Sequence, residues 1–430
     1  MSSKTKTTAT KEEAKPEMVP KLRFPEFRGA EGWEPKRLGL ALKFQAGFPF
    51  PSAGFNDAGK GLRLIRNRDL RSDDIVKFYS EDFDPNFVVN NGDVLVGMDG
   101  DFTPTVWEKG EALLNQRVGR ILPRGDNDHR FLLYLLTLCL KGIEEATART
   151  TVKHLSHSAV EDRHEPLPSP AEQQKIAECL SSVDELMAAQ ARKVDALKTH
   201  KKGLMQQLFP REGETQPRLR FPEFQNTGEW KPTSFGALGL DVSDGNYSSK
   251  YPSQSDFVAN GVPFLRANNL KFGTVSDDDM RFISKEQHSQ ITKGHLKQGD
   301  ILITTRGELG TVALVPARHI GSNINAQIVR INSGNKLVNT FLFQLLDYSR
   351  VIGLFDALST GTALKQLPIG KLNQLALRIP EIREEQERIA SCLSSLDALI
   401  TAETQKLETL KIHKKGLMQQ LFPSPEEVEA

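Results

Sequence analysis

The side chains of this chain that could recognise a ligand fall into two sets that occur in the same order. Both sets begin directly after a short apolar segment, Leu64-Ile65 in one case and Phe264-Leu265 in the other. Base-edge recognition needs groups of this kind, since arginine suits guanine while asparagine and glutamine suit adenine. Taken singly, each of these residues is more often a solvated turn residue. The first set is Arg66, Asn67, Arg68, Asp99, Lys153 and His154, and the second is Arg266, Asn268, Asn269, Arg306, Lys365 and Gln366.

Weakly similar segments relate the two sets. Residues 92–96 (Gly-Asp-Val-Leu-Val) resemble residues 299–303 (Gly-Asp-Ile-Leu-Ile), which is typical of a turn that leads into a strand. Arg306 follows the second of these strands, and Asp99 and Asp101 occupy the matching loop of the first, where an aspartate could accept a hydrogen bond from cytosine. The predicted loops are therefore equivalent in position but different in chemistry.

An enzymatic function is not favoured by the motifs. The chain has no glycine-rich phosphate loop and no Asn/Asp-Pro-Pro-Tyr/Phe methyltransferase motif, which Asp84-Pro85-Asn86-Phe87 matches only superficially. Glu34-Pro35-Lys36 has the spacing of a nuclease site but lacks a placed aspartate partner. The nine histidines and three cysteines form no metal-ligand spacing. We therefore expect no catalytic residue, no metal and no cofactor.

Two copies of one helical stretch must position these loops. Residues 172–210 and 385–423 align without a gap, and both end in His-Lys-Lys-Gly-Leu-Met-Gln-Gln-Leu-Phe-Pro. Apolar residues recur in steps of four and three, which predicts a coiled-coil seam. Ser169-Pro170-Ala171-Glu172 predicts an N-cap, a first-turn proline and a capping box for the first helix.

The polar residues of the seam predict its orientation. In an antiparallel pair whose partner numbers add to 604, Lys201 faces Glu403, Gln190 faces Lys414, and every other layer is apolar. A parallel pair would bury Lys201 against Lys414, and an antiparallel pair shifted by one heptad would place lysines against leucines. We therefore predict an intramolecular antiparallel coiled coil in the first of these registers.

A second repeat precedes each globular segment. Residues 21–27 (Lys-Leu-Arg-Phe-Pro-Glu-Phe) return as residues 218–224 (Arg-Leu-Arg-Phe-Pro-Glu-Phe), each followed by a tryptophan. The predicted fold class is α+β, with two domains of duplicated fold separated by the two long helices. The expected segments are a tail at 1–20, domain 1 at 21–165, a helix at 166–210, domain 2 at 211–378, a helix at 379–423 and a tail at 424–430.

Composition is typical of a globular protein, with 38% hydrophobic and 26% charged residues. No segment suggests a membrane span or a signal peptide. The cysteines predict no disulfide, because Cys179 and Cys392 would lie far apart in the predicted register, and a reducing cytoplasm fits. The net charge of +1 gives no overall attraction to DNA. Residues 34–165 carry 18 Lys/Arg and 20 Asp/Glu, whereas residues 231–378 carry 16 and 11.

This order of parts resembles that of specificity subunits of type I restriction–modification systems. The resemblance rests on the Leu-Arg-Phe-Pro-Glu-Phe tags, the Glu-Gln-x-x-Ile-Ala helix starts and the repeated helix ends, and it covers nearly the whole chain. It implies two target-recognition domains that each read half of a bipartite site in double-stranded DNA, with the paired helices as a spacer. It also implies two adenine-methylating modification subunits that dock on the helices, and ATP-driven restriction subunits, around a non-catalytic chain. Domain 1 is the shorter, so its loops are expected to read fewer bases.

An alternative of a different class is a coiled-coil scaffold whose domains bind protein or other ligands. Each predicted helix would be roughly 58 Å long at ~1.5 Å per residue, which exceeds one turn of DNA. DNA reading therefore predicts a discontinuous target with an unspecified spacer, whereas the scaffold predicts no sequence preference. Neither the bases recognised nor the spacer length follows from the sequence.

Overall fold

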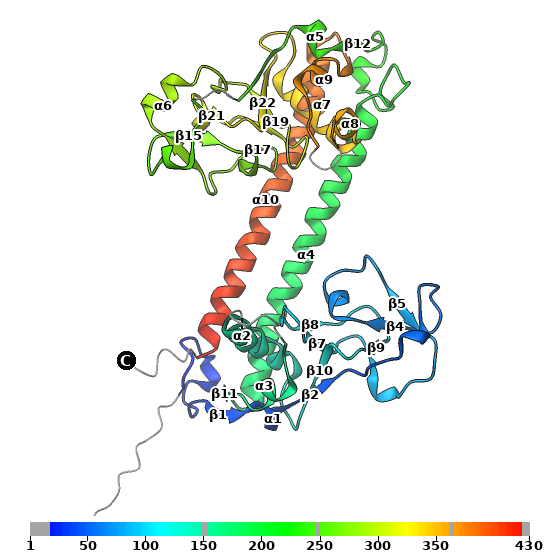
Figure 1. The fold of residues 1–430 in the computed structure, drawn as a ribbon, viewed down its shortest axis with the longest axis vertical. Coiled ribbons are helices and arrows are strands. Elements are labelled where there is room, and N and C mark those ends of the chain that lie inside the picture. The colour runs from blue at the N-terminus through cyan, green and yellow to red at the C-terminus, as the bar shows by residue number, and fades with distance from the viewer. Residues whose placement is uncertain (1–17, 148–153, 246–249, 362–364, 424–430) are drawn as a thin grey trace, which may run out of the picture. The chain divides into compact units, whose positions relative to one another are not determined.

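The computed structural model describes residues 18–147, 154–245, 250–361 and 365–423. The chain forms two compact units, one of residues 1–189 with 408–430 and the other of residues 190–407. Each unit contains one mixed α+β domain and a segment of each long helix, α4 (Pro170–Leu208) and α10 (Arg383–Leu421) (Figure 1). The predicted fold class, a duplicated α+β domain with two long helices, is confirmed.

Domain 1 is built on two sheets. An antiparallel sheet has the order β2-β10-β7-β8, and a second sheet has the order β3-β5-β4-β9-β6, in which β4 and β9 are parallel. The strands of the first sheet are β2 (Leu42–Ala46), β10 (Val118–Pro123), β7 (Val94–Gly97) and β8 (Thr105–Val106). Those of the second are β3 (Phe55–Asn56), β5 (Lys77–Tyr79), β4 (Leu62–Ile65), β9 (Ala112–Leu114) and β6 (Val88–Val89). The remaining elements are the pair β1 (Glu34–Arg37) and β11 (His164–Leu167), with helices α1 (Leu38–Ala41), α2 (His129–Thr147) and α3 (His157–Glu161).

Domain 2 repeats this plan. Its sheets have the orders β13-β22-β19-β20 and β14-β18-β15-β21, again with one parallel pair, β15 and β21. The strands of the first are β13 (Asp241–Asp244), β22 (Ile328–Asn332), β19 (Ile301–Thr304) and β20 (Val312–Leu314). Those of the second are β14 (Phe257–Val258), β18 (Arg281–Ile283), β15 (Val262–Leu265) and β21 (Asn323–Ile324). The remaining elements are β12 (Lys231–Ser234), β23 (Ala376–Ile379), the hairpin β16 (Leu270–Lys271) and β17 (Thr274–Val275), and helices α5 (Phe235–Leu238), α6 (Lys285–Gln290), α7 (Asn339–Val351), α8 (Leu354–Leu358) and α9 (Ile369–Asn373).

One glycine in each domain shows how closely the two copies match. A Cβ on Gly47 would lie 2.1 Å from the carbonyl oxygen of Asn115, and a Cβ on Gly245 would lie 2.2 Å from that of Asn325. Both glycines follow the first strand of their sheet and donate their backbone N–H groups to equivalent carbonyls. Only glycine permits so close a backbone approach, so both copies of the fold require it here.

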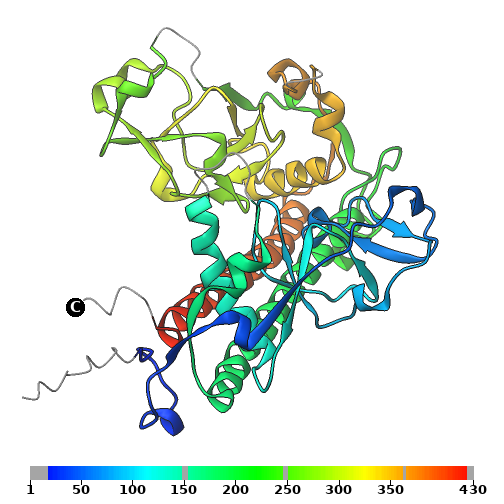
Figure 2. The same ribbon diagram turned by 60° about the horizontal axis from the view of Figure 1, so that its bottom comes forward.

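The segments of α4 and α10 that belong to one unit run side by side in opposite directions, as Figures 1 and 2 show. In the unit of domain 2, Gln190 donates to the Glu403 carboxylate over 2.7 Å, and Lys201 donates to Asp397 over 2.6 Å. In the unit of domain 1, Lys414 forms an ion pair with Asp184 at 2.7 Å. The predicted antiparallel orientation is therefore confirmed in both units.

The predicted register is wrong. Lys201 binds Asp397 instead of Glu403, and Glu403 accepts hydrogen bonds from Gln190 and Lys193. Partner numbers add to 598 (201 and 397; 184 and 414) or to 593 (190 and 403), instead of 604. The register with a sum of 604 would follow only if the polar residues of the seam bound each other directly across it. A lysine has a stem long enough to reach a carboxylate beside the seam, so a register with lysines against leucines becomes acceptable.

These lysines also join the long helices to the domains. In the unit of domain 1, Asp184 accepts from Lys414 and, over 2.7 Å, from Tyr134 of α2. The second unit repeats the junction at the equivalent positions, where Asp397 accepts from Lys201 and, over 2.7 Å, from Gln344 of α7. Lys201 also binds Asp347 of α7 at 3.0 Å. Lys201 therefore contacts a helix of its domain, α7, as well as the other long helix, α10.

Glu403 makes the helix pair sensitive to acid. The hydrogen bonds from Lys193 and Gln190 lower the pKa of this carboxyl from 4.5 to about 2. Because the pKa is lower in the folded chain, the unfolded chain takes up the proton first, so this stabilisation is complete above about pH 4.5 and is lost as the pH falls toward about 2. The free energy of unfolding, measured with denaturant, should fall less between pH 6 and pH 3.5 in Glu403→Gln than in the unmodified chain. An equal loss in both would contradict this assignment.

A buried ion pair attaches each tag to the start of a long helix. Arg23 donates two hydrogen bonds of 2.8 Å to Glu172, and Arg220 donates bonds of 2.7 and 2.8 Å to Glu385. Ser169 caps α4 as predicted, since its hydroxyl accepts the backbone N–H of Glu172. The predicted capping role of the Glu172 carboxylate is wrong, because that carboxylate binds Arg23 instead. The bidentate geometry satisfies both carboxylate oxygens in each unit.

An aromatic cluster forms the centre of each core. In the unit of domain 1 the Trp33 ring lies 6.0 Å from those of Phe131 and Phe422, and the two phenylalanine rings are 5.4 Å apart. The equivalent rings of the other unit are separated by 5.9 to 6.3 Å. They belong to Trp230, Phe341 and Phe209. Each core therefore combines a tag tryptophan, a domain helix and the end of a long helix.

Candidate functional site

The structure brings together residues that the sequence had only placed in equivalent positions. Asp99 and His154 form an isolated antiparallel bridge at the end of β7, and Arg306 and Gln366 form the same bridge at the end of β19. In domain 1 the neighbouring backbone bonds are Met98 N–H to Arg117 C=O (3.0 Å) and Leu155 N–H to Met98 C=O (2.8 Å). Domain 2 repeats them as Thr305 N–H to Gln327 C=O (2.8 Å) and Leu367 N–H to Thr305 C=O (3.0 Å). The predicted loops therefore share one backbone framework.

In domain 1 this framework holds a charged cluster. The Asp99 carboxylate lies 2.9 Å from Nδ1 of His154 and 3.3 Å from Nη1 of Arg117. The side chains remain open to solvent, with exposed fractions of 38% for Asp99, 42% for His154 and 54% for Arg117. Both contacts use Oδ1 of Asp99, so two donor side chains lie beside this carboxylate, and its acceptance of a hydrogen bond from cytosine stays a prediction.

Arg117 was missed by the sequence reasoning. Residues 115–121 (Asn-Gln-Arg-Val-Gly-Arg-Ile) resemble residues 325–331 (Asn-Ala-Gln-Ile-Val-Arg-Ile), but this likeness indicates a strand and not a site. Its contact with Asp99 depends on the register between β10 and β7, in which Val118 lies opposite Gly97. The available signal was that Arg117 directly precedes that strand segment on a polar turn, as Gln327 does in the second copy.

The equivalent place in domain 2 is a small cavity of about 410 Å³. Arg306 and Gln366 line it together with Asp244 of β13 and Thr305. Gln327 is exposed and directly precedes β22. Its side-chain oxygen accepts a 3.1 Å hydrogen bond from Asn325. Donor and acceptor groups thus converge where domain 1 has an ion-paired cluster.

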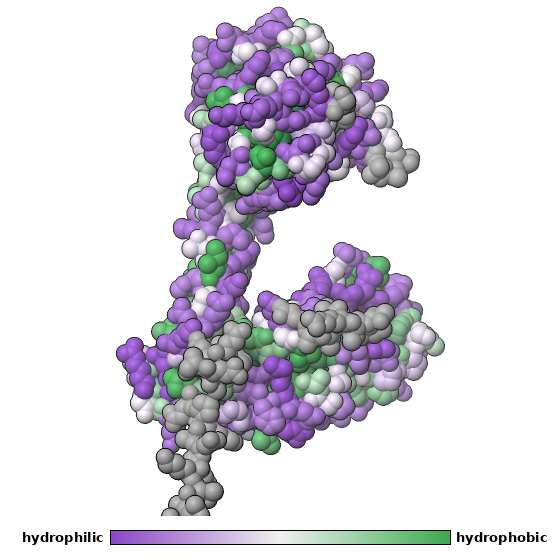
Figure 3. All heavy atoms as spheres, turned by 60° about the vertical axis from the view of Figure 1, so that its left-hand side comes forward, coloured by the Kyte–Doolittle hydropathy of each residue, from purple (hydrophilic) through white to green (hydrophobic). Residues whose placement is uncertain are grey.

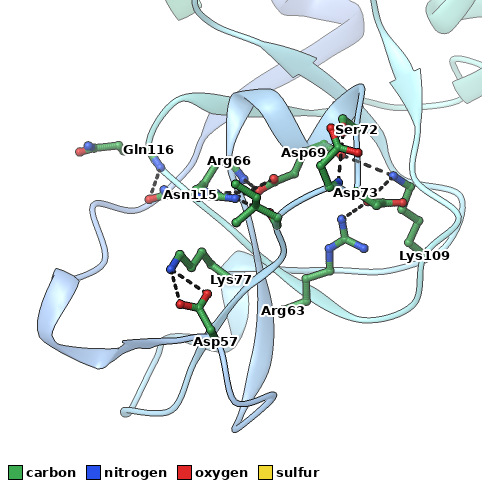
Figure 4. A network of polar contacts seen from close by, with 12 residues as sticks. Asp57, Arg63, Arg66, Asp69, Ser72, Asp73, Lys77, Lys109, Asn115 and Gln116 are labelled. Atoms are coloured by element: carbon green, nitrogen blue, oxygen red, sulfur yellow. Dashed lines mark hydrogen bonds and ion pairs between the residues drawn. The ribbon is translucent and has the colours of Figure 1, made fainter. Parts of the chain in front are cut away.

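Two predicted arginines stabilise their own loops instead of facing a ligand. Arg66 donates to Asp69 over 2.9 and 3.0 Å and to the Ile75 carbonyl over 2.6 Å, and Figure 4 shows its guanidinium beside the Asp69 carboxylate. These bonds raise the pKa of Arg66, mainly through Asp69. Arg266 occupies the same position in domain 2 and donates to Asp279 over 2.7 Å.

Two of the three predicted asparagines, Asn269 and Asn67, donate hydrogen bonds within the fold. Asn269 is 0% exposed and donates to the carbonyls of Ser276 and Asp278, so its amide cannot contact a base in this structure. Asn67 donates over 2.7 Å to the Asp99 carbonyl and so holds the backbone of the charged cluster in place. Asn269 is fully buried and Asn67 half-buried, because the tight turn after the strand directs these side chains back toward the sheet.

The other predicted residues differ in their surroundings. Arg68 and Asn268 are exposed, and the Asn268 side chain contributes to the low pKa of Asp279 after the larger effect of Arg266. Lys365 donates to Asp356 over 3.3 Å, outside the cavity. Lys153 lies outside the described residues.

A second polar network in domain 1 is structural. Arg63 and Lys109 both bind Asp73, as Figure 4 shows, and hydrogen bonds from Lys109 and Arg63 lower the Asp73 pKa. The Arg63 guanidinium also lies 5.0 Å from the centre of the buried Trp107 ring. Such cation–π and ion-pair contacts fix the loop that precedes β9.

Within the described part of the chain, no group of three or more His, Cys, Asp or Glu side chains is placed to hold a metal ion. No helix there is both long and apolar enough to cross a membrane.

Fold and site together define a class of duplicated recognition protein, in which two α+β domains with matching loops are joined through paired helices. A family model described as "Type I restriction modification DNA specificity domain" matches residues 30–199 and 241–411. The chain therefore belongs to the family of type I restriction–modification DNA specificity domains, and the resemblance noted in the sequence is confirmed.

Relatives and solved structures agree with this assignment. The specificity subunit of the type I restriction enzyme EcoBI from Escherichia coli is 29% identical over 360 residues, which cover 79% of this chain and 74% of that subunit. The MjaVIII specificity subunit from Methanocaldococcus jannaschii is 25% identical over 403 residues, covering 92% and 93%. The structure of a type I restriction–modification S subunit from M. genitalium matches in fold with a TM-score of 0.61 at 15% identity, covering 95% of this chain and all of that one.

Proposed function

We propose that this chain, as a DNA sequence-specificity subunit, reads a bipartite target in double-stranded DNA with one domain on each half. The observation that carries this proposal is the shared loop framework, which presents Asp99 and His154 in one domain and Arg306 and Gln366 in the other. A conserved backbone with different exposed hydrogen-bonding groups is what two readers of unlike half-sites require.

The two long helices support a gapped target. Each of α4 and α10 has 39 residues, which corresponds to roughly 58 Å at ~1.5 Å per residue. Successive major-groove half-sites on one face of DNA are about 34–36 Å apart. Helices of this length are sufficient for an unspecified spacer between the two half-sites.

We further propose that the chain is non-catalytic and positions two adenine-methylating modification subunits and ATP-driven restriction subunits in the cytoplasm. The leucines Leu186 and Leu399 occupy equivalent places in the repeated helices, and both are exposed, by 58% and 41%. Figure 3 shows that the surface of the helices is mostly hydrophilic, with small hydrophobic spots. Two equivalent exposed leucines, one on each repeated helix, suit a partner that is present in two copies.

A domain exchange tests the proposed function. Residues 231–378 would be replaced by the corresponding segment of a related specificity subunit, and methylated motifs would be mapped by methylation-sensitive sequencing in cells that carry the complete system. We expect one half-site to change while the other half-site and the spacer length stay the same. The reciprocal exchange of residues 34–165 serves as the matched control and should change only the other half.

Changes in both half-sites after a single exchange would contradict the assignment of one half-site to each domain. If the unmodified system showed no sequence-selective methylation, the scaffold alternative would be favoured instead.

A further inference from the structure

Three segments that are far apart in the sequence meet at the same place in both domains. Strand β7 or β19 ends there, the turn before β10 or β22 lies beside it, and the segment before α3 or α9 forms the bridge. We call the side chains at these three positions the readout set. The readout set is Asp99, Arg117 and His154 in domain 1 and Arg306, Gln327 and Gln366 in domain 2.

The backbone of the two readout sets is the same, but the side chains differ at all three equivalent positions. Domain 1 has a carboxylate that binds a guanidinium and an imidazole. Domain 2 has a guanidinium at the carboxylate's position and amides at the other two. Residues that only stabilise the fold are repeated between the copies, as with the buried pairs Arg23–Glu172 and Arg220–Glu385. Divergence on a retained framework is the pattern expected for positions that select different ligands.

Arg117 has the geometry of a base reader. Both of its contacts, to Asp99 and to His154, use the single nitrogen Nη1. The Nε–Nη2 edge makes no hydrogen bond to any described residue, and the side chain is 54% exposed. That edge is a pair of parallel donors, which matches the O6 and N7 acceptors of guanine in the major groove.

Two other arginines of domain 1, Arg66 and Arg120, lack this freedom. Arg66 is held by Asp69 and the Ile75 carbonyl, and Arg120 donates to Gln45 and to the Val88 and Asn86 carbonyls. Their donors are already used within the fold, so they cannot present a bidentate edge without breaking it.

We infer that the readout set determines base preference in each domain, with Arg117 reading guanine in the half-site of domain 1 and Asp99 acting as a positioning residue that orients Arg117. This inference rests on the proposed function and extends it to named residues. Arg306 reads guanine in the other half-site, and the amides of Gln327 and Gln366 suit adenine.

Methylation mapping of the full chain with its modification subunits tests the inference. Arg117→Gln should reduce the preference at one or two adjacent base pairs of one half-site by roughly 5- to 150-fold, the range for loss of a bidentate base contact. The other half-site and the spacer should not change. Arg28→Gln is the matched control, because it removes the same charge from an exposed arginine that directly follows the tag of the same unit.

Two further variants separate base reading from charge and from folding. Arg117→Lys keeps the positive charge but loses the two-donor edge, so it should relax the same base pairs as Arg117→Gln. Asp99→Asn should relax those base pairs too, and adding it to Arg117→Gln should have little further effect, which a general loss of stability would not produce. Thermal unfolding of each variant should match that of Arg28→Gln.

Several outcomes would overturn the inference. They are an unchanged motif in Arg117→Gln, retained preference in Arg117→Lys, or an equal loss on all sequences, which would indicate a phosphate contact. These outcomes differ from failure of the proposed function, in which the unmodified chain would direct no gapped methylation at all.

Discussion

Phe422→Ala is expected to destabilise the unit of domain 1, although Phe422 lies at the opposite end of the sequence from that domain. Its ring stacks on Phe131 at 5.4 Å and meets Trp33 edge-on at 6.0 Å, and only 6% of the side chain is exposed. Removing a buried phenylalanine leaves a cavity and typically costs about 3–5 kcal/mol. That is a large part of the stability of a typical domain.

Hydrogen exchange monitored by mass spectrometry can assign the loss to one unit. Peptides from β7, β10 and α2 should exchange faster in Phe422→Ala, whereas peptides from β19 and β22 should not. Phe209→Ala is the matched variant and should give the reverse pattern, because Phe209 occupies the equivalent place in the other core. Ile412→Ala, at a side chain that is 72% exposed on the same helix, should change neither. Equal destabilisation of both units by Phe422→Ala would contradict two separate cores.

Glu385→Ala is expected to destabilise the unit of domain 2 by about 3–5 kcal/mol, the cost of leaving one member of a buried ion pair without its partner. The Arg220 and Glu385 side chains are 7% and 1% exposed, and the Trp230 indole also donates to Glu385 over 3.2 Å. The variant would therefore leave a buried guanidinium and a buried indole N–H without their acceptor.

Two further variants test whether the loss of stability in Glu385→Ala comes from the buried charge that is left unpaired. Urea unfolding of Glu384→Ala, at the exposed neighbouring position, should give a change of less than about 0.5 kcal/mol. The double variant Arg220→Met with Glu385→Leu should lose less stability than Glu385→Ala, because replacement of both charges by apolar groups leaves no buried charge unpaired. A double variant that is less stable than Glu385→Ala would show that the pair itself is strongly stabilising.

The repeats and the helical periodicity of the sequence by themselves determine the architecture of this protein. Residues 172–210 and 385–423 predicted two long helices, and α4 and α10 are found there. The antiparallel orientation also followed from sequence, because a parallel pair would have placed Lys201 against Lys414. The helices can be predicted because the helical period is set by residues a few positions apart on one face of the helix. The orientation can be predicted because it depends on which charged residues of the seam would meet.

The register of the helices and the composition of the readout set were decided only by tertiary structure. Lys201 binds Asp397 and Asp347 because α7 brings the second carboxylate to the seam, and no pattern within the helix sequence reports that. Asn268 and Asn269 are neighbours in one turn, but Asn268 is exposed and Asn269 is buried, because the turn directs only the second side chain inward. Arg117 meets Asp99 only through the pairing of β10 with β7. Contacts between segments far apart in the sequence depend on strand register and packing, which the local sequence does not determine.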